Sequence, residues 1–118
     1  MADLGPLGSK WAACAEAWSG GALDAWDGLF ADDCVWDGPQ GRVSGSAAIV
    51  AGLSEIRKAF GWQAHEVVSC SEGLDGVVAL LGKNTFASGA TTSVAAGLLF
   101  VDGKVSEIRS VGGLPDVL

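Results

Sequence analysis

GLLFVDGKVSEIRSVGG, residues 97–113, contains a strong signal of secondary structure. Apolar and β-branched residues flank Asp102-Gly103, and a two-residue Asp-Gly loop between such runs is a strong signal for a β-hairpin. Similar segments precede it, broken by Glu72-Gly73 and Ser88-Gly89. The sequence therefore predicts four strands, near residues 62–71, 75–87, 90–101 and 104–112.

The residues before the strands have helical spacing. Large side chains in residues 9–18 recur at i, i+3 and i+7 before a Gly20-Gly21 stop, and residues 23–30 repeat this spacing. Residues 46–60, with Ser46 as the cap, predict a third helix. A short strand at 34–37 and a turn at 38–41 are expected between them. Helices followed by a meander predict an α+β domain with three N-terminal helices on an antiparallel sheet.

Length and charge limit the possible functions. The 118 residues suit one domain spanning residues 1–118, and the net charge of −7 disfavours nucleic acid and anionic membranes as partners. No apolar run approaches the roughly 18 residues of a membrane span, and the start lacks a signal peptide, so we expect a cytoplasmic protein. A mean hydropathy of +0.37 indicates that some apolar surface meets a partner.

The chain also lacks familiar catalytic and metal-binding motifs. Cys14, Cys34 and Cys70 form no CxxC or Cys/His pattern, so we interpret them as small buried thiols. A nucleophile elbow, a phosphate loop, a zinc-protease motif and a dinucleotide fingerprint are all missing. We therefore expect no metal and no cofactor.

Two segments carry a resemblance to a known family. Residues 20–60, GGALDAWDGLFADDCVWDGPQGRVSGSAAIVAGLSEIRKAF, and the closing hairpin with Gly103, Lys104, Val105 and Arg109 resemble the SnoaL-like and ketosteroid isomerase-like domains of the nuclear transport factor 2-like superfamily. The resemblance implies a cone-shaped domain whose three helices cover a strongly curved, mixed or antiparallel sheet. It also implies a cavity between the helices and the sheet.

The chain departs from the ketosteroid isomerases at their catalytic positions. Gly38 stands where the isomerases have their aspartate base, with Asp37 one residue earlier. Cys14 stands at the position of the oxyanion-hole tyrosine, and its partner aspartate falls near Ala96. These differences argue against steroid isomerase activity.

The implied cavity would be lined mainly by aromatic and apolar side chains. The candidate ligand-binding residues are Cys14, Trp18, Trp26, Phe30, Trp36, Phe86, Leu98, Phe100 and Ile108. Such a wall favours a flat apolar small molecule. The alternative is that these side chains simply fill the core, since aromatic residues are ordinary core material.

Asp37 and His65 are the candidate catalytic residues. Asp37 would remove a proton and His65 would donate to the developing oxyanion, provided that both face the cavity. The alternatives are a solvated Asp37 at the Pro39 turn and a surface His65 beside Glu66. Strand alternation puts Trp36 inward and so tends to turn Asp37 outward.

Two functions remain open from the sequence. One is a small acid/base enzyme of the cyclase, isomerase or dehydratase type, and the other is a non-catalytic ligand-binding or dimeric interaction domain. Apolar residues on the outer positions of residues 77–81 and 95–101 predict a homodimer through the convex face of the sheet.

Overall fold

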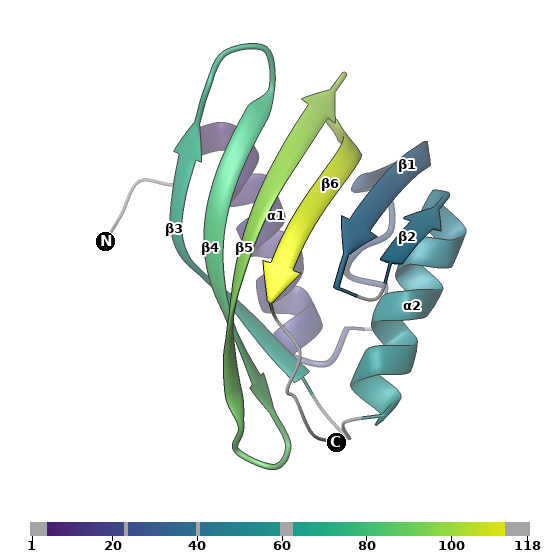
Figure 1. Ribbon diagram of the computed structural model, residues 1–118, viewed down its shortest axis with the longest axis vertical. Coiled ribbons are helices and arrows are strands. Elements are labelled where there is room, and N and C mark those ends of the chain that lie inside the picture. Colours follow the sequence, from purple (N-terminus) through teal and green to yellow (C-terminus); the bar gives the residue numbers. More distant parts are fainter. Residues whose placement is uncertain (1–4, 23, 40, 60–62, 113–118) are drawn as a thin grey trace.

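The computed structural model describes residues 5–22, 24–39, 41–59 and 63–112, and they form a curved sheet with two helices (Figure 1). The helices are α1 (Gly5–Ser19) and α2 (Ser46–Ala59). The strands are β1 (Phe30–Gly38), β2 (Gly41–Ser44), β3 (Gln63–Glu72), β4 (Val77–Phe86), β5 (Thr91–Val101) and β6 (Lys104–Gly112). The predicted α+β class is confirmed. Neither helix in the described part of the chain is long and apolar enough to cross a membrane.

The sheet is mixed, with the order β2-β1-β6-β5-β4-β3. All neighbouring strands are antiparallel except β1 and β6, which pair in parallel. The register shifts between Val67 and Ser69 in β3 and between Leu99 and Phe100 in β5. Such irregularities bend and twist strands, and the sheet curves around α1, which lies behind it in Figure 1. The concave side therefore faces the helices.

Helix α1 docks on the sheet through one apolar face and one carboxylate. Its buried residues are Gly8, Trp11, Ala15 and Trp18. At its N-terminus, Glu72 of β3 accepts hydrogen bonds from the backbone N–H groups of Leu7 and Gly8, the latter at 3.0 Å. A carboxylate there satisfies unpaired donors and complements the helix dipole. The helix begins before the expected Ser9 because its cap comes from a distant strand.

The predicted helix over residues 23–30 is wrong. Residues 24–29 form successive turns, in which the Asp27 N–H bonds to the Asp24 carbonyl at 3.0 Å and the Leu29 N–H to the Trp26 carbonyl at 3.2 Å. These are i to i+3 bonds, and Gly28 has a φ of 80° that α-helix does not allow. The described residues thus contain two helices instead of three.

The region around the Pro39 turn contains more strand than expected. β1 begins at Phe30 instead of Cys34, so Phe30, which was expected to end a helix, belongs to the sheet. The turn after Gly38 leads directly into β2, which pairs antiparallel with β1 from Gly38 opposite Gly41 to Val35 opposite Ser44. β2 was not predicted because four exposed residues carry little alternation of hydrophobicity.

The four strands after residue 62 are confirmed, with their ends within two residues of the expected positions. In β4 the burial alternates almost perfectly along the strand. The Asp102-Gly103 hairpin is also confirmed, since both residues have a positive φ, 53° and 79°, as a two-residue turn of this kind requires.

The core lies between the concave face and the helices. The largest fully buried side chains come from α1, from the turns before β1 and from the sheet: Trp18, Leu29, Cys34, Val78, Phe86, Val105 and Ile108. The prediction of buried thiols holds fully only for Cys34, because Cys14 and Cys70 are partly exposed. Burial raises the pKa of the Cys34 thiol to about 11, so this thiol stays protonated.

Gly76→Ala should destabilise the fold more than Gly89→Ala. Both glycines have a positive φ, 81° and 88°. A Cβ at Gly76 would also overlap the carbonyl oxygen of Phe100, whereas the space beside Gly89 is empty. We expect a loss of about 1 kcal/mol in the free energy of unfolding for Gly89→Ala and at least about 2 kcal/mol for Gly76→Ala, measured by urea denaturation. Equal losses would contradict this.

Candidate functional site

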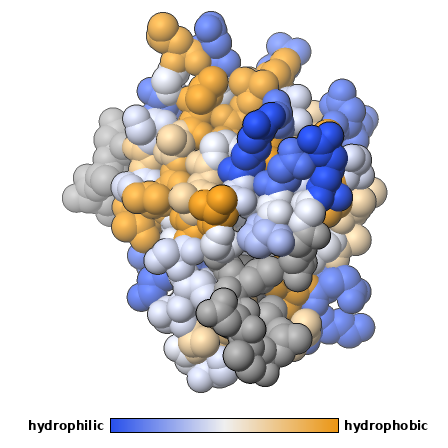
Figure 2. Space-filling model, viewed as in Figure 1, coloured by the Kyte–Doolittle hydropathy of each residue, from blue (hydrophilic) through white to orange (hydrophobic). Residues whose placement is uncertain are grey.

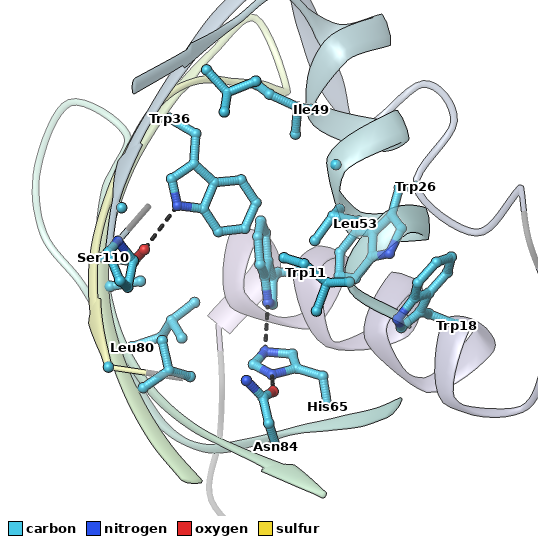
Figure 3. Close-up of a pocket in the computed structure, with 18 of the residues that line it drawn as sticks. Trp11, Trp18, Trp26, Trp36, Ile49, Leu53, His65, Leu80, Asn84 and Ser110 are labelled. Carbon is cyan, nitrogen blue, oxygen red and sulfur yellow. Dashed lines mark hydrogen bonds between the residues drawn. The ribbon is translucent and has the colours of Figure 1, made fainter. Parts of the chain in front are cut away.

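A cavity of about 170 Å³ lies between α1, α2 and the concave face of the sheet (Figure 3). Four tryptophans contribute to its wall: Trp11, Trp18, Trp26 and Trp36. The α2 helix adds Ile49, Gly52, Leu53 and Ile56, and the sheet adds residues that include Leu80, Asn84, Val94, Ala96 and Ser110. No acidic or basic side chain lines the cavity, and His65 is the one titratable group there among the described residues.

Trp11 stands at the centre of the aromatic wall. Its ring lies 5.0 Å from Trp26, 6.1 Å from Phe30 and 6.3 Å from Trp36, centroid to centroid, in tilted and edge-on arrangements. These geometries are favourable for aromatic pairs. Figure 3 shows the Trp11 ring between Trp36 and Trp26, with its nitrogen directed toward His65.

The indole of Trp36 is held by the last strand. Its Nε1–H donates to the hydroxyl of Ser110 at 2.8 Å. Trp36 and Ser110 lie on β1 and β6, the parallel strand pair. A hydrogen bond across this pair fixes the ring as one wall of the cavity, opposite Leu53 (Figure 3).

His65 is held by two hydrogen bonds. The Trp11 Nε1–H lies 3.2 Å from His65 Nε2, and His65 Nδ1 lies 2.7 Å from Asn84 Oδ1. An indole nitrogen only donates, so Nε2 must accept and carry no proton. The proton of the neutral ring is then on Nδ1, where it is donated to the Asn84 oxygen. The arrangement selects one neutral tautomer.

The pKa of His65 is lowered from its usual value. Burial of the imidazole is the larger cause, and the hydrogen bond with Asn84 opposes it. Protonation would also place an N–H on Nε2 facing the N–H of Trp11. Gly82 provides room for the ring, since a Cβ there would lie 2.6 Å from His65 Cε1. His65 is therefore a neutral, tightly held group at pH 7.

The structure brings three of the nine candidate ligand-binding residues to the cavity, namely Trp18, Trp26 and Trp36. The other six do not line it and lie in or against the core: Cys14, Phe30, Phe86, Leu98, Phe100 and Ile108. Some of the candidate residues thus line the cavity, as the binding hypothesis predicts, and the others pack in the core, as the alternative predicts. Trp11 and the α2 residues Ile49, Gly52, Leu53 and Ile56 line the cavity but were not among the candidate ligand-binding residues.

Asp37 and His65 do not face the same space. The Asp37 carboxylate binds Arg42 in a bidentate ion pair at 2.8 and 3.0 Å, on the face opposite the cavity. The hydrogen bond from Arg42 lowers the pKa of Asp37, the opposite of what a base in an apolar pocket requires. Alternation along β1 points Trp36 inward and Asp37 outward, so the geometry lacks the acid/base pair that the sequence suggested.

The described residues thus combine two helices and a curved mixed sheet around an aromatic cavity. The model of the SnoaL-like domain matches residues 11–108, and the chain belongs to this family. A search of curated proteins found no match.

Solved structures share the fold at low sequence identity. A putative hydroxylase, AclR, from Streptomyces galilaeus is 25% identical, and the aligned region covers 94% of this chain and 91% of the AclR chain with a TM-score of 0.75. A putative polyketide cyclase from Sinorhizobium meliloti is 20% identical over 92% of this chain and 95% of its own, with a TM-score of 0.76. A ketosteroid isomerase-like protein from Catenulispora acidiphila in complex with trimethylamine is 16% identical over 92% and 85%, with a TM-score of 0.77.

The His65 tautomer and pKa can be measured by NMR titration. We expect a pKa below 6.5 in the wild type and a higher value in Trp11→Phe, which removes the N–H that opposes protonation. Because the folded pKa is below the unfolded one, this histidine's contribution to stability is full above about pH 6.5 and is lost as the pH falls through the folded pKa.

The matched control is His65→Gln, whose free energy of unfolding should lose this component of pH dependence below about pH 6.5. A wild-type pKa at or above 6.5, or no change in Trp11→Phe, would contradict the assignment.

Proposed function

We propose that the domain binds a small, neutral, largely apolar molecule in the tryptophan-lined cavity. The observation that carries the proposal is the chemistry of the wall, in which the described residues contribute four indoles and aliphatic side chains and no charged group. An anion would lose its hydration there without gaining a partner, and a cation would gain only the faces of the indoles. A neutral one gains apolar contact and a few polar neighbours.

The size of the cavity indicates a ligand of about one ring. Its 170 Å³ is close to that of an engineered apolar cavity of about 150 Å³ that binds benzene. A larger molecule would extend beyond the enclosed space, past Pro39 and Val43 at the β1–β2 end. The cavity therefore does not enclose a multi-ring compound completely.

Acid/base catalysis by His65 is the second candidate function. His65 is the titratable group of the cavity wall, and Nε2 is its unprotonated nitrogen. A substrate hydroxyl that replaced the Trp11 N–H at Nε2 could give its proton to this nitrogen, while Asn84 holds the other side of the ring. In this role the group acts alone, without Asp37. The activity of His65→Gln against wild type, once a substrate is found, tests it.

Tryptophan fluorescence should report ligand binding directly. We expect neutral ring compounds such as toluene or indole to quench or shift the emission with micromolar affinity, and benzoate to bind at least about tenfold more weakly. Tetramethylammonium serves as the cationic probe, because aromatic walls can also hold cations. Tighter binding of either ion than of toluene would contradict the proposal.

We also propose that the domain forms a homodimer through the convex face of the sheet. Val77, Leu81 and Val101 are about half exposed there, and Val111 is 68% exposed. Gly97 leaves open space above β5, which allows the backbone of a partner to approach closely. In Figure 2 the apolar surface adjoins a strongly polar area on the same face.

The charges on this face suit a second copy of the same chain. The pairs Asp37–Arg42 and Glu107–Arg109 present both signs beside the apolar strands. A two-fold axis brings the same patch of each copy together, so a surface that carries both signs can be complementary to itself. An acidic or basic partner would match only half of these groups.

Light scattering at micromolar concentration tests the dimer. We expect the mass of a dimer for the wild type and of a monomer for Leu81→Asp, because a buried unpaired carboxylate opposes association. Leu74→Asp is the matched control, since Leu74 is 87% exposed in the turn between β3 and β4, outside the strands that form the convex face. A monomeric wild type would overturn the proposal.

A further inference from the structure

One face of α2 forms a wall of the cavity. Ile49, Gly52, Leu53 and Ile56 all line it, and their spacing of i, i+3, i+4 and i+7 puts them on a single side of the helix. Figure 3 shows Ile49 and Leu53 directed from α2 toward Trp36 and Trp11. Gly52 is the member of this face that has no side chain.

Neither backbone conformation nor packing explains a glycine at position 52. Gly52 lies inside α2 and is not among the residues with a positive φ. A Cβ built on it would meet no atom within 4 Å. Glycine is the least favourable residue for a helix interior after proline, and alanine is the most favourable. Alanine would therefore fit here and strengthen the helix.

The other glycines of the cavity wall, and Gly82 behind His65, are explained by close contacts or, at Gly41 and Gly112, by a positive φ. At Gly82 a Cβ would lie 2.6 Å from His65 Cε1, and at Gly38 it would lie 3.2 Å from both Ser110 Oγ and Trp36 Nε1. Those two glycines let neighbouring side chains reach their places. Gly52 differs from them, because what it leaves free is the cavity itself.

We propose that Gly52 is a specificity-determining residue, which keeps open a part of the cavity that the ligand occupies. This rests on the proposed binding function. A methyl group at position 52 would project from the lining face of α2 into the space enclosed by the tryptophans. The absent side chain thus sets the upper size of the ligand, at the expense of helix stability.

The test uses benzene, toluene, ethylbenzene and n-propylbenzene as probes, with binding followed by tryptophan fluorescence and calorimetry. Gly52→Ala should raise the melting temperature by about 3 to 5 °C through helix propensity. It should also weaken the largest probe that the wild type binds by at least about tenfold, because an overfilled cavity is strained. Benzene should bind as before, so the preferred size shifts to a smaller ring compound.

Exchanging two neighbouring residues separates stability from cavity size. Ala51 is exposed on the other side of α2, so Ala51→Gly should lower the melting temperature without altering the order of affinities. The double variant Ala51→Gly with Gly52→Ala keeps the composition of the helix. Its melting temperature should stay near that of the wild type, while its preference shifts to the smaller probes as in Gly52→Ala.

The outcomes distinguish the two levels of the proposal. If the wild type binds none of the four probes, the proposed binding function is overturned. If the wild type binds them, and both the single and the double variant that carry Gly52→Ala keep the same order of affinities, only the role of Gly52 is overturned.

Discussion

The hydrogen bond from Trp11 to His65 connects the aromatic wall of the cavity to the sheet. It joins α1 to β3, and the bond from His65 to Asn84 carries the connection on to β4. The position of the Trp11 ring in turn sets the places of Trp26 and Trp36, which pack against it. The neutral imidazole of His65 thus fixes the position of the Trp11 ring, and the same hydrogen bond favours the neutral form of His65.

Trp18, at the other end of the aromatic wall, is held by the side chain of Arg57, which does not line the cavity. The Arg57 guanidinium of α2 lies 4.6 Å from the Trp18 ring centre and donates to the Trp18 carbonyl at 2.6 Å. This contact joins the end of α1 to α2. The chain has a net charge of −7, yet none of the described acidic or basic side chains lines the cavity, so an acidic protein has an uncharged cavity wall over its described residues.

The part of the fold set by local pattern could be predicted from the sequence, and the part set by distant contacts could not. The alternation after residue 62 and the Asp102-Gly103 turn predict the sheet, because each signal lies within a few residues. The spacing of Trp26 and Phe30 imitates a helix, but the backbone at Gly28 interrupts it. Trp11 was missed because its partner is 54 residues away, which no local pattern shows.

The parallel pairing of β1 with β6 also fixes when the domain can fold during synthesis. β1 takes its inner place in the sheet only after residues 104–112 have been made, since β6 separates it from β5. The cap of α1 likewise waits for Glu72. Chains with many pairings between distant residues fold slowly, because the entropy cost of closing the long loops comes before the stabilising contacts form. On the ribosome, therefore, the four tryptophans of the cavity wall leave the exit tunnel long before β6, the strand that completes the sheet, and during this interval the chain is most prone to aggregation.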